Sequence, residues 1–281
     1  MKSLHDVPAP AKLNLFLHIT GRRPDGYHLL QSVFMLIDWC DTLHFEKRSS
    51  GAISREDLTL VLPEQDLIMR AAQLLQKHTG CTEGVHIAVD KQIPAQAGMG
   101  GGSSDAATCL LALNRLWDLK LDLPTLESLG LQLGADVPFF LRGRNAWVEG
   151  VGEKITPIEL PPAHFWVVKP PAGLDTSEIF AHAGLKRDTS TAIISVFAAD
   201  PYGFGLNDLQ SVAQSLCPEV TQALDVLERA GLRARMTGSG SAVFAPCDAN
   251  NSDLSVPDGF MVKRCSNLEF HPLWGWASSD S

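Results

Sequence analysis

A glycine-rich segment, Gly98-Met99-Gly100-Gly101-Gly102-Ser103-Ser104, stands where a strand pattern ends and a helix-forming stretch begins. The start of a helix has unpaired backbone N–H groups and carries about half a positive elementary charge. Glycine lets this backbone approach an anion with no side chain in between, and the two serines add hydroxyl donors or helix caps. The segment therefore predicts a phosphate site, and with it a nucleotide-binding protein.

The spacing of this loop excludes two familiar classes of nucleotide-binding loop. A Walker A loop ends in Gly-Lys-Ser/Thr, whereas Gly102 is followed by Ser103, Ser104 and Asp105. The dinucleotide pattern G-x-G-x-x-G also fails, because Ser103 stands where its last glycine belongs. A dinucleotide-dependent oxidoreductase is disfavoured further by the missing ribose-binding acid. Taken alone, the loop also fits a flexible turn before a buried helix.

Lys12 and Asp136 are suited to phosphoryl transfer. A carboxylate can orient or deprotonate the attacking hydroxyl, while a nearby ammonium neutralises charge on the transferred group. Each residue also has an ordinary structural interpretation. Lys12 fits a strand lysine that reaches solvent, and Asp136 fits the N-cap of a short helix that contains Pro138.

Two further segments have side chains or amides that a nucleotide-linked substrate would use. Gly238-Ser239-Gly240-Ser241 fits a hairpin turn, or a second run of backbone N–H groups that closes over a phosphate. Tyr27 and His28 follow the turn formers Pro24-Asp25-Gly26. They fit an exposed turn pair, and Phe180 fits a core aromatic. Only a shared cleft would make these three residues a base-recognition site.

A strand and a buried helix must position these groups. Positions 11–19 alternate like a half-buried strand, which places Lys12 and Asn14 on the same face. Residues 105–117 are apolar almost all round and predict a helix buried in the core. Strand patterns also cover 32–39, 41–47 and 85–89, and helices are predicted over 67–77, 123–134 and 218–232. Strands and turns are expected in 144–153 and 233–247.

The composition indicates a folded protein of one large or two ordinary domains, with 281 residues, 45% hydrophobic and 20% charged. Prolines gather at 157–162, so we predict domains of residues 1–157 and 158–281. The net charge of −9 argues against a nucleic-acid partner. The chain has no apolar run of roughly 18 residues, and its start lacks a signal-peptide core, so we expect a cytoplasmic protein without membrane contact.

Six cysteines are scattered along the chain without a C-x-x-C pair. We expect free thiols and no metal site built from protein ligands.

Four segments occur in an order that resembles one known superfamily: PAKLNLFLHITGRRPDGYH, PAQAGMGGGSSDAAT, GADVPFF and MTGSGSAVF. Together they resemble the GHMP kinases, which include galactokinase, homoserine kinase and mevalonate kinase, from about Pro8 to Phe244. The first and third segments resemble most the branch that acts on a cytidine diphosphate-linked methylerythritol in the non-mevalonate route to isoprenoids. The glycine loop and the GSGS segment are common to the superfamily.

This resemblance implies an α/β (α+β) protein of two domains, the first ribosomal-protein-S5-like and the second ferredoxin-like, with the active site between them. It implies transfer of phosphate from ATP, with Mg²⁺, to the 2-hydroxyl of the methylerythritol. Lys12 and Asp136 match the catalytic pair. The ATP loop is matched by Pro94, Ala95, Gln96, Ala97, Gly98, Met99, Gly100, Gly101, Gly102, Ser103 and Ser104, with Gly238, Ser239 and Gly240 as a second phosphate loop. The substrate site is matched by Asn14, Tyr27, His28, Thr176 and Phe180.

The loop departs from the family at Gln96 and Ala97, where many members have glycine. We therefore expect that backbone angles open only to glycine are unnecessary at these two positions, and that phosphate contacts concentrate from Gly98 onward. Asp105 would repel a phosphate, so it is expected to point away from the ligand.

Two alternatives stay open: another GHMP kinase acting on homoserine or mevalonate, and a non-catalytic nucleotide-binding sensor that keeps the fold. For the kinase we expect ATP and one small molecule as partners, and a monomer or weak homodimer.

Overall fold

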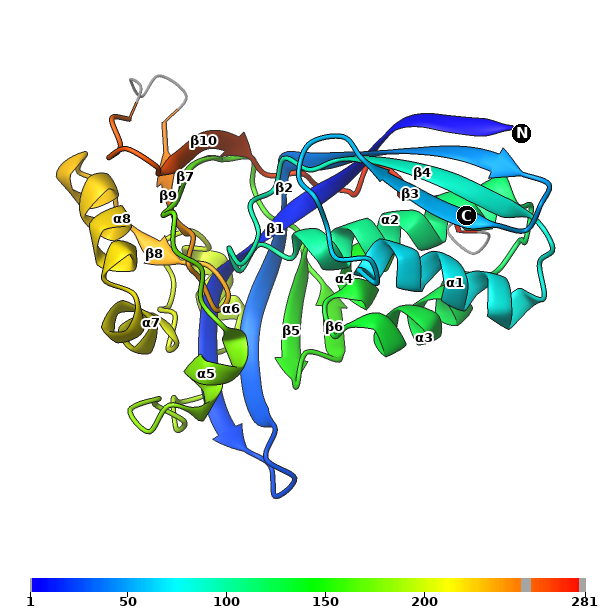
Figure 1. Ribbon diagram of the computed structural model, residues 1–281. Coiled ribbons are helices and arrows are strands. Elements are labelled where there is room, and N and C mark those ends of the chain that lie inside the picture. The colour runs from blue at the N-terminus through cyan, green and yellow to red at the C-terminus, as the bar shows by residue number, and fades with distance from the viewer. Residues whose placement is uncertain (1, 249–253, 278–281) are drawn as a thin grey trace.

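The protein folds into two lobes, each built on its own sheet, in a computed structural model that describes residues 2–248 and 254–277. The larger sheet has the strand order β3-β4-β2-β5-β6, with β1 paired to β2, and the smaller has the order β10-β7-β9-β8. Figure 1 shows helices α1 to α4 covering one face of the larger sheet. The mixed α/β content and the two lobes confirm the predicted fold class.

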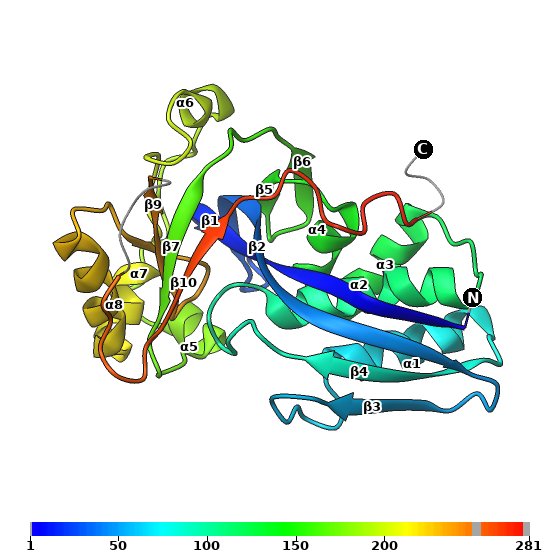
Figure 2. The ribbon, with the colours of Figure 1, turned by 90° about the horizontal axis from the view of Figure 1, so that it is seen from above.

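Strands β1 (Ser3–Arg22) and β2 (His28–Arg48) form a long antiparallel hairpin that runs the length of the larger sheet (Figure 2). Both are longer than the sequence predicts, and β2 joins two predicted strands into one. The expectation of a half-buried strand at 11–19 is wrong, because residues 9–19 and 31–37 are buried on both faces. Register shifts after Pro10 and after Asn14 bend β1 near Lys12.

The rest of the larger sheet consists of β3 (Ile53–Asp57), β4 (Gly84–Asp90), β5 (Ala146–Gly150) and β6 (Lys154–Pro157). Its helices are α1 (Leu67–Thr79), α2 (Gly101–Leu116), α3 (Leu123–Leu133) and α4 (Val137–Arg142). Helix α1 ends two residues beyond its predicted range, just before Gly80 with a left-handed φ of 66°, and α2 is buried almost all round, as predicted. Helix α2 therefore projects its N-terminus from the middle of the core.

The smaller sheet contains β7 (His164–Lys169), β8 (Arg235–Met236), β9 (Val243–Cys247) and β10 (Met261–Ser266). Its helices are α5 (Thr176–Ala181), α6 (Ile194–Ala199), α7 (Gln210–Leu216) and α8 (Pro218–Arg229). The predicted helix at 218–232 and the strand-turn-strand at 233–247 are confirmed. Short elements such as β3, α5, α6 and α7 escape sequence reasoning, because few residues give them too little periodicity.

The two lobes share apolar core. One buried cluster joins Leu13 and Met99 of the first lobe to Phe165 and Phe244 of the second. Near the end of the chain, Leu273 and Ala277 pack against the core of the first lobe. The division at 157 and 158 stays a prediction, and these last residues show that the chain returns to the first lobe after β10.

Candidate active site

Lys12 reaches the site from the middle of β1 and does not extend to solvent. Its side chain is 5% exposed, and its Nζ lies 3.8 Å from Asp136 Oδ2. The same ammonium donates a hydrogen bond to Asn14 Oδ1 and lies 4.8 Å from the centre of the Phe34 ring. Burial lowers the pKa of Lys12, and the Asp136 carboxylate opposes this shift. The interpretation of Lys12 as an ordinary surface lysine is therefore wrong.

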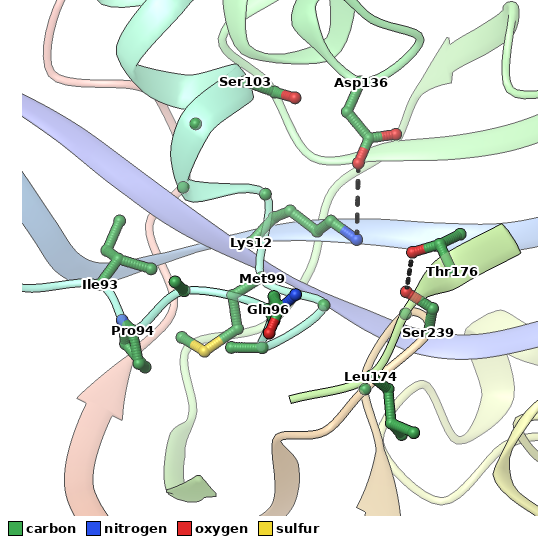
Figure 3. Close-up of a pocket in the computed structure, with 18 of the residues that line it drawn as sticks. Lys12, Ile93, Pro94, Gln96, Met99, Ser103, Asp136, Leu174, Thr176 and Ser239 are labelled. Carbon is green, nitrogen blue, oxygen red and sulfur yellow. Dashed lines mark hydrogen bonds and ion pairs between the residues drawn. The ribbon is translucent and has the colours of Figure 1, made fainter. Parts of the chain in front are cut away.

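Asp136 stands at the N-cap position of α4, and Pro138 lies in the first turn of that helix. Its carboxylate nevertheless makes no capping hydrogen bond. It points instead toward Lys12, as Figure 3 shows, and stays one-third exposed. The helix thus fixes the backbone of Asp136 while the side chain is left available to the site, so the helix-cap interpretation does not account for this residue.

The glycine-rich loop lines one wall of a cavity of about 770 Å³, together with Lys12, Asn14 and Asp136. Left-handed φ angles recur at every second residue, with 51° at Gln96, 70° at Gly98 and 71° at Gly100. Alternating backbone angles of this kind turn successive N–H groups toward one concavity, where they bind anions. The prediction that glycine-type angles are unnecessary at position 96 is wrong, because Gln96 adopts one. The same prediction holds at Ala97, which is not among the residues with a positive φ.

The Gly238-Ser239-Gly240-Ser241 segment of the second lobe packs against this loop. A Cβ atom on Gly98 would lie 2.3 Å from the Thr237 carbonyl oxygen and 2.8 Å from the Gly240 nitrogen. Ser241 N–H donates to the Gln96 carbonyl at 3.0 Å, and Gly240 N–H donates to the Thr237 carbonyl at 2.9 Å. The N–H groups of Gly240 and Ser241 therefore already donate to carbonyl groups of the protein. Gly238, Ser239 and Gly240 still line the cavity.

Three residues at the start of α2 have different surroundings. Ser103 lines the cavity, whereas Ser104 is fully buried and its hydroxyl has no partner in the described part of the chain. Asp105 also lines the cavity, but its carboxylate accepts a hydrogen bond from Lys91 Nζ at 2.5 Å. Burial raises the pKa of Asp105 to about 8, against the effect of Lys91.

Lys91 is a residue that sequence reasoning missed. Its ammonium lies between the Asp105 and Asp41 carboxylates, and Asp41 Oδ1 accepts the backbone N–H groups of Gln92 and Ile93 at 2.6 and 2.7 Å. This group ties the strand end before the glycine loop to the helix after it. The only signal in the sequence was a lysine shortly before Pro94.

The predicted substrate residues are brought together in part. The His28 ring lies 5.0 Å from the Phe180 ring, and Phe180 lines the cavity. Thr176 also lines it, with its hydroxyl 2.7 Å from the Ser239 hydroxyl (Figure 3). Neither His28 nor Tyr27 lines the cavity, and Tyr27 is 64% exposed.

A divalent cation would find few protein ligands here. The described residues contain no cluster of three or more His, Cys, Asp or Glu side chains that could hold a metal. Mg²⁺ characteristically uses one or two carboxylates, water and substrate phosphates, so Asp136 and the Ser103 hydroxyl fit a cation brought by a nucleotide. Such a cation would supply charge neutralisation on the phosphates.

The six cysteines are free thiols, as predicted. Within the described ranges, no helix has the length and apolar character to cross a bilayer.

Comparison with known proteins gives family matches along the chain. Residues 66–144 match the GHMP kinases N terminal domain, and residues 195–254 match the GHMP kinases C terminal model. A 4-diphosphocytidyl-2-C-methyl-D-erythritol kinase of Acidovorax sp. (strain JS42) is 66% identical over 280 residues, covering 98% of this chain and 99% of its own. A protein of the same name from Variovorax paradoxus (strain S110) is 62% identical, covering 99% and 100%.

Solved structures agree with these matches. A crystal structure of 4-(cytidine 5'-diphospho)-2C-methyl-D-erythritol kinase superposes with a TM-score of 0.76 at 32% identity, covering 92% of this chain and 98% of its own. Methanococcus jannaschii mevalonate kinase, at 16% identity, shares the fold with a TM-score of 0.68 over 94% of this chain and 99% of its own. The chain belongs to the GHMP kinases, in the family of the 4-diphosphocytidyl-2-C-methyl-D-erythritol kinases.

Proposed function

We propose that the protein transfers the γ-phosphate of ATP to the 2-hydroxyl of 4-diphosphocytidyl-2-C-methyl-D-erythritol, giving the 2-phosphate in the non-mevalonate route to isoprenoids. Full-length relatives named for this kinase activity support the reaction class and the substrate. The observation that supports it most within the chain is the Lys12–Asp136 pair, which faces the same cavity as the glycine loop.

In this proposal the ATP phosphates lie along the loop from Gly98 to Ser103, at the start of α2. The backbone N–H groups and the helix dipole there attract negative charge without a lysine in the loop itself. Mg²⁺ would accompany the nucleotide and offset the charge of its phosphates, with Asp136 and Ser103 within the same cavity. Gly238 and Ser239 border the phosphates from the second lobe.

Asp136 orients the attacking hydroxyl and is placed to accept its proton. Lys12, buried beside it, stabilises the charge on the transferred group. Asn14 adjoins the Lys12 ammonium, and its amide donates to the Ser32 hydroxyl at 2.8 Å. This second bond fixes which end of the Asn14 amide faces Lys12. Asn14 therefore contributes a fixed polar wall near the sugar alcohol.

The cytidine diphosphate portion extends toward His28 and Phe180. These two rings pack against one another in a tilted arrangement, and Phe180 reaches the cavity that contains the loop. Tyr27 stands beside them on an exposed turn and would have to move inward to contact the base. The oligomeric state, a monomer or weak homodimer, and the cytoplasmic location stay predictions.

A labelled-phosphate transfer assay tests this function. The purified protein is given γ-labelled ATP and, separately, the cytidylyl substrate, homoserine or mevalonate. We expect transfer to the cytidylyl substrate alone, with label on the 2-hydroxyl. Preferred transfer to homoserine or mevalonate would identify another GHMP kinase instead.

A direct ATP-binding measurement by calorimetry completes the test. Undiminished ATP binding without transfer to any of the three alcohols would identify a nucleotide-binding sensor. In the same assays Asp136→Asn should lose transfer while it still binds ATP, and its matched control is Asp118→Asn, the same chemical change at an exposed residue outside the cavity.

A further inference from the structure

Arg187 lies in the segment after α5 and is fixed there by several hydrogen bonds. Its guanidinium donates to the backbone carbonyls of Leu185, Phe180 and His182 at 2.9, 3.1 and 2.9 Å. The Nε–H of the same group donates to His28 Nε2 at 3.0 Å. The three carbonyl contacts leave the side chain little freedom, so the contact with His28 is made in a set direction.

This contact determines the tautomer of His28. An arginine side chain has only donors and stays protonated, so the histidine nitrogen facing it must act as an acceptor. A neutral imidazole whose Nε2 is an acceptor has its proton on Nδ1. Burial lowers the pKa of His28, and Arg187 and Arg22 lower it further, which favours the neutral ring. The Phe180 ring packs against the imidazole at an interplanar angle of 36° and brings no charge.

The ring therefore presents one N–H donor to a ligand. Among the described residues, His28 Nδ1 makes no hydrogen bond within the protein, while Nε2 is occupied by Arg187. A donor at this position suits N3 of cytosine, which is an acceptor, and conflicts with N3 of uracil, which has a hydrogen. The other tautomer would reverse this preference.

We propose that Arg187 is a specificity-determining positioning residue: by occupying His28 Nε2, it fixes His28 as an Nδ1–H donor and selects a cytosine over a uracil base. This inference rests on the proposed function, because it assumes that the cytidylyl group lies beside His28 and Phe180. Arg187 itself does not contact the base. It acts through the histidine, and a site whose polar group is left unpaired by the wrong base rejects that base.

The test compares the cytidine diphosphate-linked substrate with its uridine diphosphate-linked analogue. The wild-type enzyme should prefer cytidine in kcat/KM by on the order of 10²-fold or more. Arg187→Met removes the donor and should reduce this preference by roughly tenfold, mainly through KM for the cytidylyl substrate, with KM for ATP unchanged. Lys186→Met, an equal charge change at the exposed neighbour, should leave the preference as it is. An Arg187→Met enzyme that melts like wild type yet keeps the full preference would overturn the proposal.

Two measurements keep the test decisive if Arg187→Met folds poorly. The ¹⁵N shifts of His28 in the wild-type protein should show a protonated Nδ1 and an unprotonated Nε2; the opposite tautomer would refute the inference. Asparagine places an N–H near the position of Nδ1, and glutamine near that of Nε2. His28→Asn should therefore retain more of the cytosine preference than His28→Gln, and the reverse order would also refute it.

The result also separates this inference from the proposed function. A wild-type enzyme that phosphorylates the cytidine and uridine substrates equally would remove the role of Arg187 while the kinase activity stands. A wild-type protein that phosphorylates neither would remove the proposed function itself.

Discussion

Asp136→Asn is the substitution that tests the proposed chemistry most directly. Asparagine has nearly the same shape as aspartate, and the Asp136 side chain makes no capping hydrogen bond, so α4 should keep its start. The change removes a negative charge and the group able to accept a proton. It also leaves the Lys12 ammonium, 5% exposed, without the carboxylate 3.8 Å away. The pKa of Lys12, already lowered by burial, should fall further.

The size of the effect follows from this distance. Two unit charges at 3.8 Å interact by about 1 kcal/mol in water and about 4 kcal/mol at an effective dielectric constant of 20. Because Asp136 is one-third exposed, solvent screening brings the value toward the lower limit. Loss of this coupling alone would lower turnover roughly fivefold to tenfold. Loss of a proton acceptor adds a factor of roughly 10² to 10⁴, so we expect kcat to fall by at least about 10²-fold.

Steady-state release of ADP with the cytidylyl substrate measures kcat, and calorimetry measures ATP affinity separately. ATP affinity should change far less than kcat, because in the proposed function the loop amides make most of the phosphate contacts and Asp136 would add only one ligand to the accompanying Mg²⁺. Lys12→Met and the double variant complete a mutant cycle. If the two residues act as one unit, the double variant should be little worse than the poorer single variant. Turnover of Asp136→Asn within a few-fold of wild type would refute the proposed role.

Three further predictions concern the surroundings of this pair. Gly98→Ala should raise KM for ATP by roughly tenfold or more, because Gly98 has a φ of 70° and an added Cβ would lie 2.3 Å from the Thr237 carbonyl oxygen. Gly102→Ala is the matched control and should raise KM less, because its Cβ would lie 3.5 Å from the Leu67 side chain. Because burial raises the pKa of Asp105 to about 8, the folded state holds a proton that the unfolded state has released. Stability should therefore fall from about pH 4 to pH 8, and Asp105→Asn should flatten this fall in denaturant titrations. Thr237→Val leaves the Asn14 N–H without its hydroxyl acceptor at 2.9 Å, and should lower the free energy of unfolding by about 1 to 3 kcal/mol.

The features that sequence reasoning placed correctly depend on local patterns. The alternation of residues 11–19 placed Lys12 and Asn14 on one face, and these two side chains do meet. The apolar stretch after the glycine loop predicted a buried helix, and α2 is buried almost all round. In both cases the structure of a segment follows from the spacing of its own residues.

The features it missed depend on contacts between distant segments. Arg187 and His28 are 159 positions apart, and Lys91 and Asp41 are 50 positions apart. Nothing in the types of these residues distinguishes them from solvated surface charges until the chain is folded. The left-handed angle at Gln96 has the same origin, because its carbonyl accepts the Ser241 N–H from the second lobe and holds the backbone in that conformation.

Strand β1 connects the chemistry to the packing of the two lobes. The Lys12 N–H donates to the Met99 carbonyl of the glycine loop at 2.9 Å, and the Asn14 N–H donates to Thr237 beside the GSGS segment. Further along the same strand, the buried Arg235 guanidinium donates to the Leu15 carbonyl at 2.6 Å. One strand thus contacts the glycine-rich loop and the second lobe within a few residues of Lys12. A substitution that loosens either contact should shift Lys12 against the loop, which would change kcat and KM for ATP together, whereas a change confined to Asp136 should alter kcat far more than KM for ATP.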